Sequence, residues 1–401
     1  MVQLGKEQTH KLLSKMIMLI YLLFISVPLG GSTSSISCYN DQGQAVDWFY
    51  SYKLPKHGVS ESHTDGLMYL LMDGGSDGWS KGTTTVNDTT GALGRTVGQL
   101  YSSGKNAELA YILYNDQPPK GGSVDDANRR GHTKGVLLLG GSQGFWLVHS
   151  VPKFPPVRRA ARYVYPSSGT NNGQSFICVT FPLHRFQTIG EQLQINQPSV
   201  YDCDVPQSLA SVAPALAELC KKTPPMFPQH VIKAVSNRSV ALTSKGGTEF
   251  ISFAKGPMFD NDLYHSWVAP YLRSDLLVQF WVNSRGILPS DCSLDWKVLD
   301  VRLIHPGQTF TFKTTQDHSK WAVSPAPAEG GGGWVCVGDI NRNQGEKKRG
   351  GGTMCRRDPV VWKAYRTAAL ECESCGGGGV TCPSQSQSGS SVGLWKQTGR
   401  G

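Results

Sequence analysis

Several kinds of segment and site are missing from this sequence of 401 residues. Apart from the apolar run at residues 16–25, no segment is long and apolar enough to span a membrane. Cys372 and Cys375 have the spacing of two ligands of a zinc ribbon, but no second Cys-x-x-Cys or His-x-x-x-His pair supplies the other two ligands. No carboxylate cluster of the two-metal catalytic type stands out. The sequence therefore favours a protein with no metal and no cofactor, with zinc at Cys372 and Cys375 as the less favoured alternative.

The N-terminal segment has the features of a secretory signal. Lys6, Lys11 and Lys15 precede the apolar run, and small residues follow it from Gly30 to Ser35. We expect residues 1–33 to be this signal and the processed chain to have no membrane insertion. An uncleaved anchor is the alternative, against which the shortness of the apolar run argues.

Cysteines and sequons fit passage through the secretory pathway. Ten cysteines permit five disulfides in an oxidising compartment. Asn87 and Asn237 each begin an Asn-x-Ser/Thr sequon and are predicted glycosylation sites. The cysteines are Cys38, Cys178, Cys203, Cys220, Cys292, Cys336, Cys355, Cys372, Cys375 and Cys382.

The formal net charge is +9, and ten histidines would add positive charge in an acidic compartment. Such a surface suits a polyanionic partner. Secreted proteins of other kinds are often basic too, so the charge alone decides little.

Short apolar segments separated by Gly, Asn and Asp turns indicate a mixed α/β fold in two similar halves. We expect one half at 34–195, a Pro-rich connecting segment at 196–230, a second half at 231–375, and a Gly/Ser-rich disordered tail at 376–401 that is fixed only at Cys382. Strands are predicted at 46–52, 68–72, 107–114, 239–243, 249–253, 276–282 and 296–304, and helices at 262–273 and 359–370.

A His-x-Lys triplet occurs twice. His132 and Lys134 open one apolar segment, and His318 and Lys320 open another. On a strand, side chains two residues apart point to the same face, so each pair would present a histidine beside a lysine. After each triplet the sequence predicts a hairpin whose return strand brings polar groups, among them His149 and Asp339, back to the level of the starting histidine.

If the two hairpins face each other, one histidine can attack the phosphorus of a phosphate ester while the other protonates the leaving oxygen. The lysines would hold the phosphate oxygens without a metal. This pattern predicts a phosphodiesterase. A single His-x-Lys triplet is a weak signal, and two unrelated hairpins with surface histidines are the alternative.

Longer segments resemble the deoxyribonuclease II family. They are CYNDQGQAVDWFYSYKLPK, RGHTKGVLLL, GFWLVHSVPKFPP, DHSKWAVSP and WVCVGDINRNQGEKKRGGGTMC. The resemblance runs nearly from Cys38 to Cys375. It implies a phospholipase D-like fold, a pseudo-dimer of two halves that each have a central mixed sheet and flanking helices around one active site. It also implies metal-independent endonucleolytic cleavage of double-stranded DNA at acid pH in lysosomes, leaving 3′-phosphate and 5′-hydroxyl ends. No obligate protein partner is implied, and the protein could also be secreted.

On this resemblance His132, Lys134, His318 and Lys320 form the catalytic set, and a phosphohistidine intermediate is expected. His149 and Asn341 would orient the site. No acidic residue follows either lysine at the distance usual in phospholipase D enzymes, so Asp317 or Asp339 becomes the candidate for orienting the imidazoles. The sequence leaves open which histidine is the nucleophile.

The resemblance also implies disulfides between Cys38 and Cys178, Cys292 and Cys375, and Cys336 and Cys355. Cys203 with Cys220 and Cys372 with Cys382 are then the remaining pairs, which is a weaker inference. Related sequences lead us to expect a cysteine at position 322, where this chain has Ala322.

Two other functions remain. The chain could be a catalytically inactive secreted glycoprotein that binds DNA, although both triplets are intact. A metal-dependent nuclease is less compatible with the missing carboxylate cluster.

Overall fold

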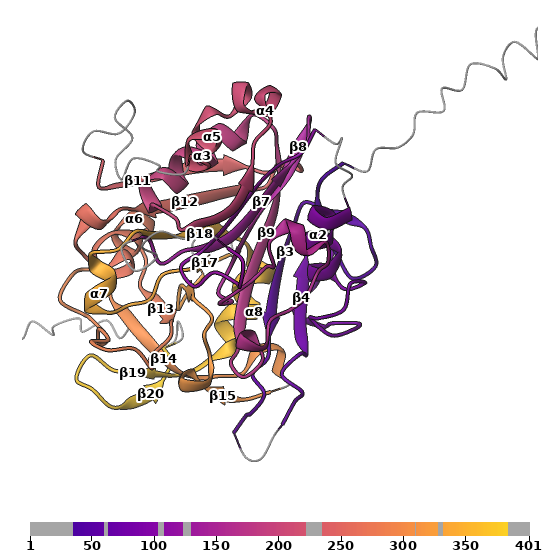
Figure 1. Ribbon diagram of the computed structural model, residues 1–401. Coiled ribbons are helices and arrows are strands. Elements are labelled where there is room, and N and C mark those ends of the chain that lie inside the picture. Colours follow the sequence, from indigo (N-terminus) through magenta and orange to yellow (C-terminus); the bar gives the residue numbers. More distant parts are fainter. Residues whose placement is uncertain are drawn as a thin grey trace, which may run out of the picture. The chain divides into compact units, whose positions relative to one another are not determined.

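Strands and helices mix along the chain in an α/β fold (Figure 1). The computed structural model describes residues 35–59, 63–102, 108–122, 130–221, 235–308, 310–327 and 332–383. The expected signal at 1–33 and the tail beyond residue 383 lie outside the described residues. Among the helices that are described, none is long and apolar enough to cross a membrane.

The first sheet has eight antiparallel strands in the order β10-β6-β7-β8-β9-β3-β4-β5. Its strands are β3 Trp48–Lys53, β4 Tyr69–Asp73, β5 Ser80–Lys81, β6 Ala110–Asn115, β7 Lys134–Leu139, β8 Gln143–His149, β9 Gln174–Pro182 and β10 Val200–Asp204. A separate small sheet pairs β1 Cys38–Tyr39 with β2 Ala45–Val46.

The second sheet has ten strands in the order β11-β12-β18-β17-β16-β13-β14-β19-β20, with β15 paired to β14. Only β13 and β14 run parallel among the pairs of the described strands. Its strands are β11 Asn237–Thr243, β12 Glu249–Lys255, β13 Leu276–Gln279, β14 Val298–Ile304, β15 Phe312–Lys313, β16 Trp321–Val323, β17 Trp334–Gly338, β18 Gly351–Arg357, β19 Ala369–Glu373 and β20 Gly379–Thr381.

The α-helices of the described residues are short. They are α2 Ala92–Ser102, α3 Arg185–Asn196, α4 Gln207–Val212, α5 Pro214–Leu219, α6 Ala269–Leu272, α7 Gln344–Lys347 and α8 Pro359–Ala368. Two of them begin at proline, whose fixed φ and missing N–H suit the first turn. In α8 the Asp358 carboxylate also accepts the N–H groups of Val360 and Val361.

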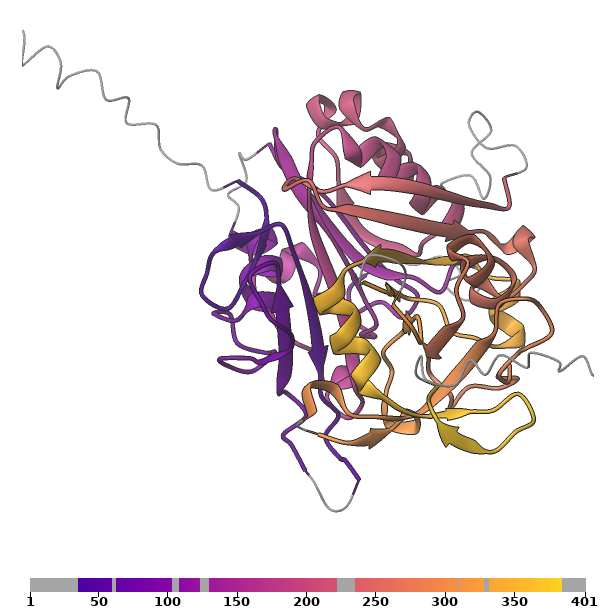
Figure 2. The same cartoon turned by 180° about the vertical axis from the view of Figure 1, so that it is seen from behind.

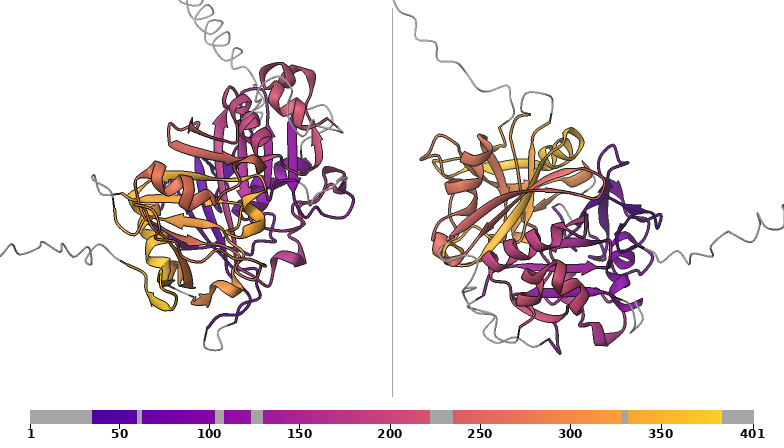
Figure 3. Two further views of the ribbon diagram at one scale, coloured as in Figure 1. Left: turned by 90° about the vertical axis from the view of Figure 1, so that its left-hand side faces the viewer. Right: turned by 90° about the horizontal axis from the view of Figure 1, so that it is seen from above.

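One apolar core joins the two sheets. Strand β3 turns Tyr50 and Tyr52 towards this core, while Phe49, which precedes Tyr50, faces a second core shared with α2. Helix α8 contributes Tyr365, whose ring lies 5.9 Å from that of Tyr50 and 5.4 Å from that of Trp321. Figures 2 and 3 show α8 between the indigo strands of the first sheet and the orange strands of the second. The sheets are therefore packed through shared aromatic side chains.

Five disulfides join the described cysteines. They join the same pairs that the sequence analysis expected: Cys38–Cys178, Cys203–Cys220, Cys292–Cys375, Cys336–Cys355 and Cys372–Cys382. Cys372 and Cys375 thus belong to two different disulfides, and the alternative of a zinc site at these two residues is wrong.

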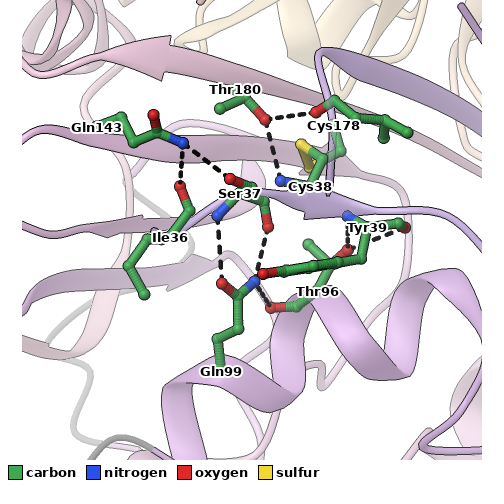
Figure 4. The surroundings of a disulfide bond; sticks show 10 residues. Ile36, Ser37, Cys38, Tyr39, Thr96, Gln99, Gln143, Cys178 and Thr180 are labelled. Carbon is green, nitrogen blue, oxygen red and sulfur yellow. Dashed lines mark hydrogen bonds between the residues drawn. A yellow bond between two sulfur atoms is a disulfide. The ribbon is translucent and has the colours of Figure 1, made fainter. Parts of the chain in front are cut away.

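The Cys38–Cys178 disulfide attaches β1 to the first sheet (Figure 4). Beside it, the N–H of Cys38 donates to the Thr180 hydroxyl at 3.0 Å, and the N–H of Tyr39 donates to Thr96 of α2 at 2.9 Å. The described chain therefore begins in a segment held by both a covalent bond and hydrogen bonds.

The expected strands are present, with ends displaced by a few residues. The helix expected at 262–273 is a π-helix at Tyr264–Val268 that continues into α6. Two differences concern the expected connecting segment and tail. Residues of the expected connecting segment form β10, α4 and α5. In the expected tail, Gly379–Thr381 forms β20 on the edge of the second sheet. This part of the tail is ordered because β19 supplies backbone partners and Cys382 is bonded to Cys372.

Candidate active site

The two His-x-Lys triplets lie at or just before the starts of two strands, β7 and β16. His132 precedes β7 and Lys134 is its first residue, while His318 and Lys320 immediately precede β16. Each strand continues into an antiparallel hairpin, β7 with β8 and β16 with β17, so both predicted hairpins are confirmed. The histidines are 5% and 8% exposed and both lysines are fully buried, which removes the cationic groups from bulk solvent.

Each imidazole is held by a backbone carbonyl from the opposite sheet. The Nδ1 of His132 lies 2.7 Å from the carbonyl oxygen of Asp339, just after β17. The Nδ1 of His318 lies 2.8 Å from the carbonyl oxygen of Ser150, just after β8. A carbonyl only accepts, so both Nδ1 atoms donate and the neutral rings carry their lone pairs on Nε2. The return strand of each hairpin thus orients the histidine of the other hairpin.

An acidic residue that the sequence analysis missed lies beside the first triplet. Asp116 follows β6, and its carboxylate pairs with Lys134 and lies 3.6 Å from Nε2 of His132. Arg349 approaches the same carboxylate at 3.8 Å. Burial alone would raise the pKa of Asp116, but Lys134, His132 and Arg349 outweigh it and hold this pKa below its ordinary range.

The second triplet has different neighbours. The Nζ of Lys320 donates to the carbonyl of His318 at 2.6 Å and lies 3.2 Å from Nδ1 of the same residue. The indole of Trp281 meets the His318 ring edge-to-face, with centroids 5.1 Å apart. His318 therefore has an ammonium group and an aromatic ring where His132 has a carboxylate.

Burial and neighbouring cations make both histidines weak bases. Burial, followed by the charge of Lys134, lowers the pKa of His132 to about 4, against the opposing effects of Asp116 and Glu346. Burial, followed by Lys320, Lys134 and His132, lowers the pKa of His318 well below its usual value. Lys320 also lowers the pKa of His132, so the two triplets lie within electrostatic range of each other.

The structure also gives the surroundings of His149 and Asn341, the two other residues expected to orient the site. His149 is buried against Phe154 and Phe176, its Nδ1 accepts the N–H of Val151, and burial lowers its pKa well below the usual value. The Oδ1 of Asn341 accepts the N–H of Trp281 at 3.3 Å, beside His318.

Neither candidate carboxylate contacts an active-site imidazole. The Asp317 carboxylate accepts from Tyr52 at 2.5 Å and Ser319 at 2.6 Å. That of Asp339 accepts the N–H of Gly352 at 3.1 Å, and only its carbonyl reaches His132. Residue spacing in the sequence could not have indicated which carbonyl contacts each imidazole, because every residue has a backbone carbonyl. Within the described part of the chain, no group of three or more His, Cys, Asp or Glu side chains is arranged to hold a metal ion.

Two buried His-x-Lys triplets with crossed carbonyl contacts are an arrangement chemically able to hydrolyse a phosphate ester, and comparison with known proteins places the chain in one family. The family model for deoxyribonuclease II matches residues 37–375. Deoxyribonuclease-2-alpha of Mus musculus is 45% identical over 355 residues, which are 88% of this chain and 97% of that protein. Deoxyribonuclease-2-beta of Homo sapiens is 38% identical, covering 92% of this chain and 99% of that protein, and plancitoxin-1 of Acanthaster planci is 36% identical, covering 90% and 99%. The chain belongs to the deoxyribonuclease II family.

Proposed function

We propose that this protein is an acid endonuclease that hydrolyses the phosphodiester bonds of double-stranded DNA without a divalent metal, leaving 3′-phosphate and 5′-hydroxyl ends. Membership of the deoxyribonuclease II family supports the deoxyribonuclease activity itself. The observation that carries the finer proposal is the crossed pairing, in which each histidine is oriented by the carbonyl behind the opposite hairpin. Because both rings present Nε2, two imidazoles can act on one phosphorus.

The reaction has two steps in this proposal. One histidine attacks phosphorus through Nε2 and forms a phosphohistidine, while the other protonates the departing 5′ oxygen. The second histidine, now neutral, then removes a proton from water, which attacks phosphorus and releases the 3′-phosphate. Lys134 and Lys320 stabilise the charge that develops on the phosphate oxygens.

The first test is plasmid nicking at about pH 5 with excess chelator. We expect cleavage to continue, since lysine and histidine side chains neutralise the phosphate in this proposal. Loss of activity in chelator, restored by magnesium, would overturn the metal-free mechanism. Binding without nicking would favour the alternative of a catalytically inactive secreted DNA-binding glycoprotein.

We also propose that the fold is a phospholipase D-like pseudo-dimer, with halves at 34–195 and 231–375. The equivalent positions of β7–β8 and β16–β17 support this assignment, since each hairpin follows a His-x-Lys triplet and ends at an orienting carbonyl.

The proposed place of action is the lysosome, reached through the secretory pathway, with secretion as a further possibility. Five disulfides and the exposed sequon at Asn87 are compatible with this route. Glycosidase digestion of secreted protein, followed by mass measurement, tests modification of Asn87 and Asn237.

A further inference from the structure

We propose that the two histidines have fixed and different roles: His318 is the nucleophile, and His132, whose protonated form the positioning residue Asp116 favours, is the general acid. This assignment rests on the proposed function and deepens it. The reason lies in one position at which the two halves of the site differ.

Strand register identifies that position. Asn115 of β6 lies opposite Lys134, and Gln279 of β13 lies opposite Trp321, the residue after Lys320. Asp116 is the first residue after β6, and Trp281 is the second residue after β13. The register therefore places these two residues at equivalent positions beside their triplets. One is a carboxylate and the other an indole, so the two histidines cannot have the same affinity for a proton.

The surroundings of His132 favour its protonated form relative to those of His318. Its Nδ1 is occupied by the Asp339 carbonyl, and its Nε2 faces the Asp116 carboxylate at 3.6 Å. Lys134 is ion-paired with that carboxylate. Burial, followed by the charge of Lys134, opposes protonation of His132 more strongly than Asp116 favours it. Glu346 also favours the proton and Lys320 opposes it, while Arg349 lies 3.8 Å from Asp116. The preference is therefore relative to His318, which has Trp281 where His132 has Asp116.

The surroundings of His318 favour its neutral form. Because Nδ1 of His318 donates to the Ser150 carbonyl, the Lys320 amine 3.2 Å away cannot donate to it and, when protonated, acts only as a neighbouring positive charge. Lys134 and His132 add to this effect, and Trp281 supplies no compensating charge. Burial, followed by the charge of Lys134, lowers the pKa of Lys320 well below its usual value. The nearest carboxylate on the same segment, Asp317, is engaged by Tyr52 and Ser319.

The bonds and protons then balance as follows. The Nε2 lone pair of His318 forms the N–P bond, the P–O5′ bond breaks, and the 5′ oxygen takes the Nε2 proton of His132. Neutral His132 next takes a proton from water. The resulting oxygen bonds to phosphorus, the N–P electron pair returns to His318, and the 3′-phosphate leaves with His132 protonated again.

A change of leaving atom separates the two roles. Two oligonucleotides of identical sequence are used at pH 5 with chelator, one natural and one with sulfur in place of a single bridging 5′ oxygen. A thiolate leaves without a general acid because its conjugate acid has a pKa near about 8.5. The wild-type enzyme is the control on both substrates.

We expect His132→Ala to lose about 10²–10⁴-fold on the natural substrate but to release about one thiol per enzyme in a burst from the sulfur substrate. The burst should stop there because the phosphohistidine lacks its general base. His318→Ala should lose both activities. Three outcomes would overturn the assignment while leaving the proposed function intact: the sulfur substrate restores thiol release to His318→Ala alone, to both variants, or to neither. Failure of the wild-type enzyme to cleave natural DNA overturns the proposed function instead.

Asp116 has its own test in the pH dependence of the rate. Asp116→Asn should shift the basic limb of the profile to lower pH by about 1 unit, since His132 then loses its proton more easily. Asp116→Glu should restore the limb towards the wild-type position. A fall by the same factor at every pH, with an unchanged midpoint, would mean that Asp116 serves only the fold and would overturn its positioning role.

Discussion

At the scale of single residues, the proposed mechanism depends on two histidines that are both buried and both oriented by carbonyls. We predict that His132→Ala and His318→Ala each reduce DNA cleavage by at least about 10²-fold while leaving the fold and DNA affinity largely unchanged. Each substitution removes one half of a two-step reaction and little core packing. Nicking assays, with circular dichroism for the fold, measure both effects.

The exposed His184, at the start of α3, provides the matched control. His184→Ala should cleave DNA at the wild-type rate. Near wild-type turnover by either active-site variant would mean that the paired-histidine mechanism is wrong.

Asp339 gives a second prediction at this scale, on stability. Burial raises the pKa of its carboxyl to about 7, so folded Asp339 stays protonated where the unfolded chain ionises from about pH 4 upwards. Its contribution to stability is therefore full below about pH 4 and is lost as the pH rises to about 7. His132 acts in the opposite direction, because its lowered pKa makes acidification from about pH 6.5 to 4 destabilising.

Asp339→Asn removes the pH-dependent contribution of Asp339 to stability and leaves that of His132. The free energy of unfolding of the variant should fall less between pH 4 and 7 than that of the wild type, by at most about 4 kcal/mol. Urea denaturation across this range measures it. An identical pH dependence in the two proteins would show that Asp339 is ionised in the folded state.

At the scale of elements, α8 packs against the core shared by the two sheets, and Tyr365 is its largest fully buried side chain. Tyr365 is fully buried and its ring lies 5.2 Å from that of Trp79, as well as near Tyr50 and Trp321. Tyr365→Ala should lower the free energy of unfolding by about 3–5 kcal/mol through the cavity it leaves. Lys363→Ala, on the exposed face of the same helix, should change it by less than about 0.5 kcal/mol. Equal effects in chemical denaturation would contradict the role given to α8.

Sequence periodicity and motifs predicted the elements that form the site but not how they meet. The strands around both triplets were predictable because they are apolar and bounded by turns. Asp116 was not, since it follows β6 by one residue and reaches His132 only after β6 pairs with β7. The carbonyls of Ser150 and Asp339 were equally hidden, because they belong to the backbone and act across two sheets.

At the scale of the whole molecule, the formal charge of +9 bears on the DNA substrate. Each phosphate that the protein neutralises releases counterions, so affinity should fall steeply with salt. With four such contacts, we expect DNA binding to weaken by about 10²-fold between 50 and 200 mM salt. Fluorescence anisotropy with a labelled duplex at pH 5 measures the slope, and an affinity independent of salt would contradict binding through phosphates.

The most direct test of the account is the rate of DNA cleavage in excess chelator as a function of pH. The mechanism needs one neutral and one protonated imidazole at the same time, and burial lowers the pKa of His132 to about 4. The account predicts a bell-shaped profile with its maximum on the acid side of about pH 6.5, the ordinary value for histidine. A rate that stays flat through neutral pH, or that appears only when magnesium is supplied, would contradict it.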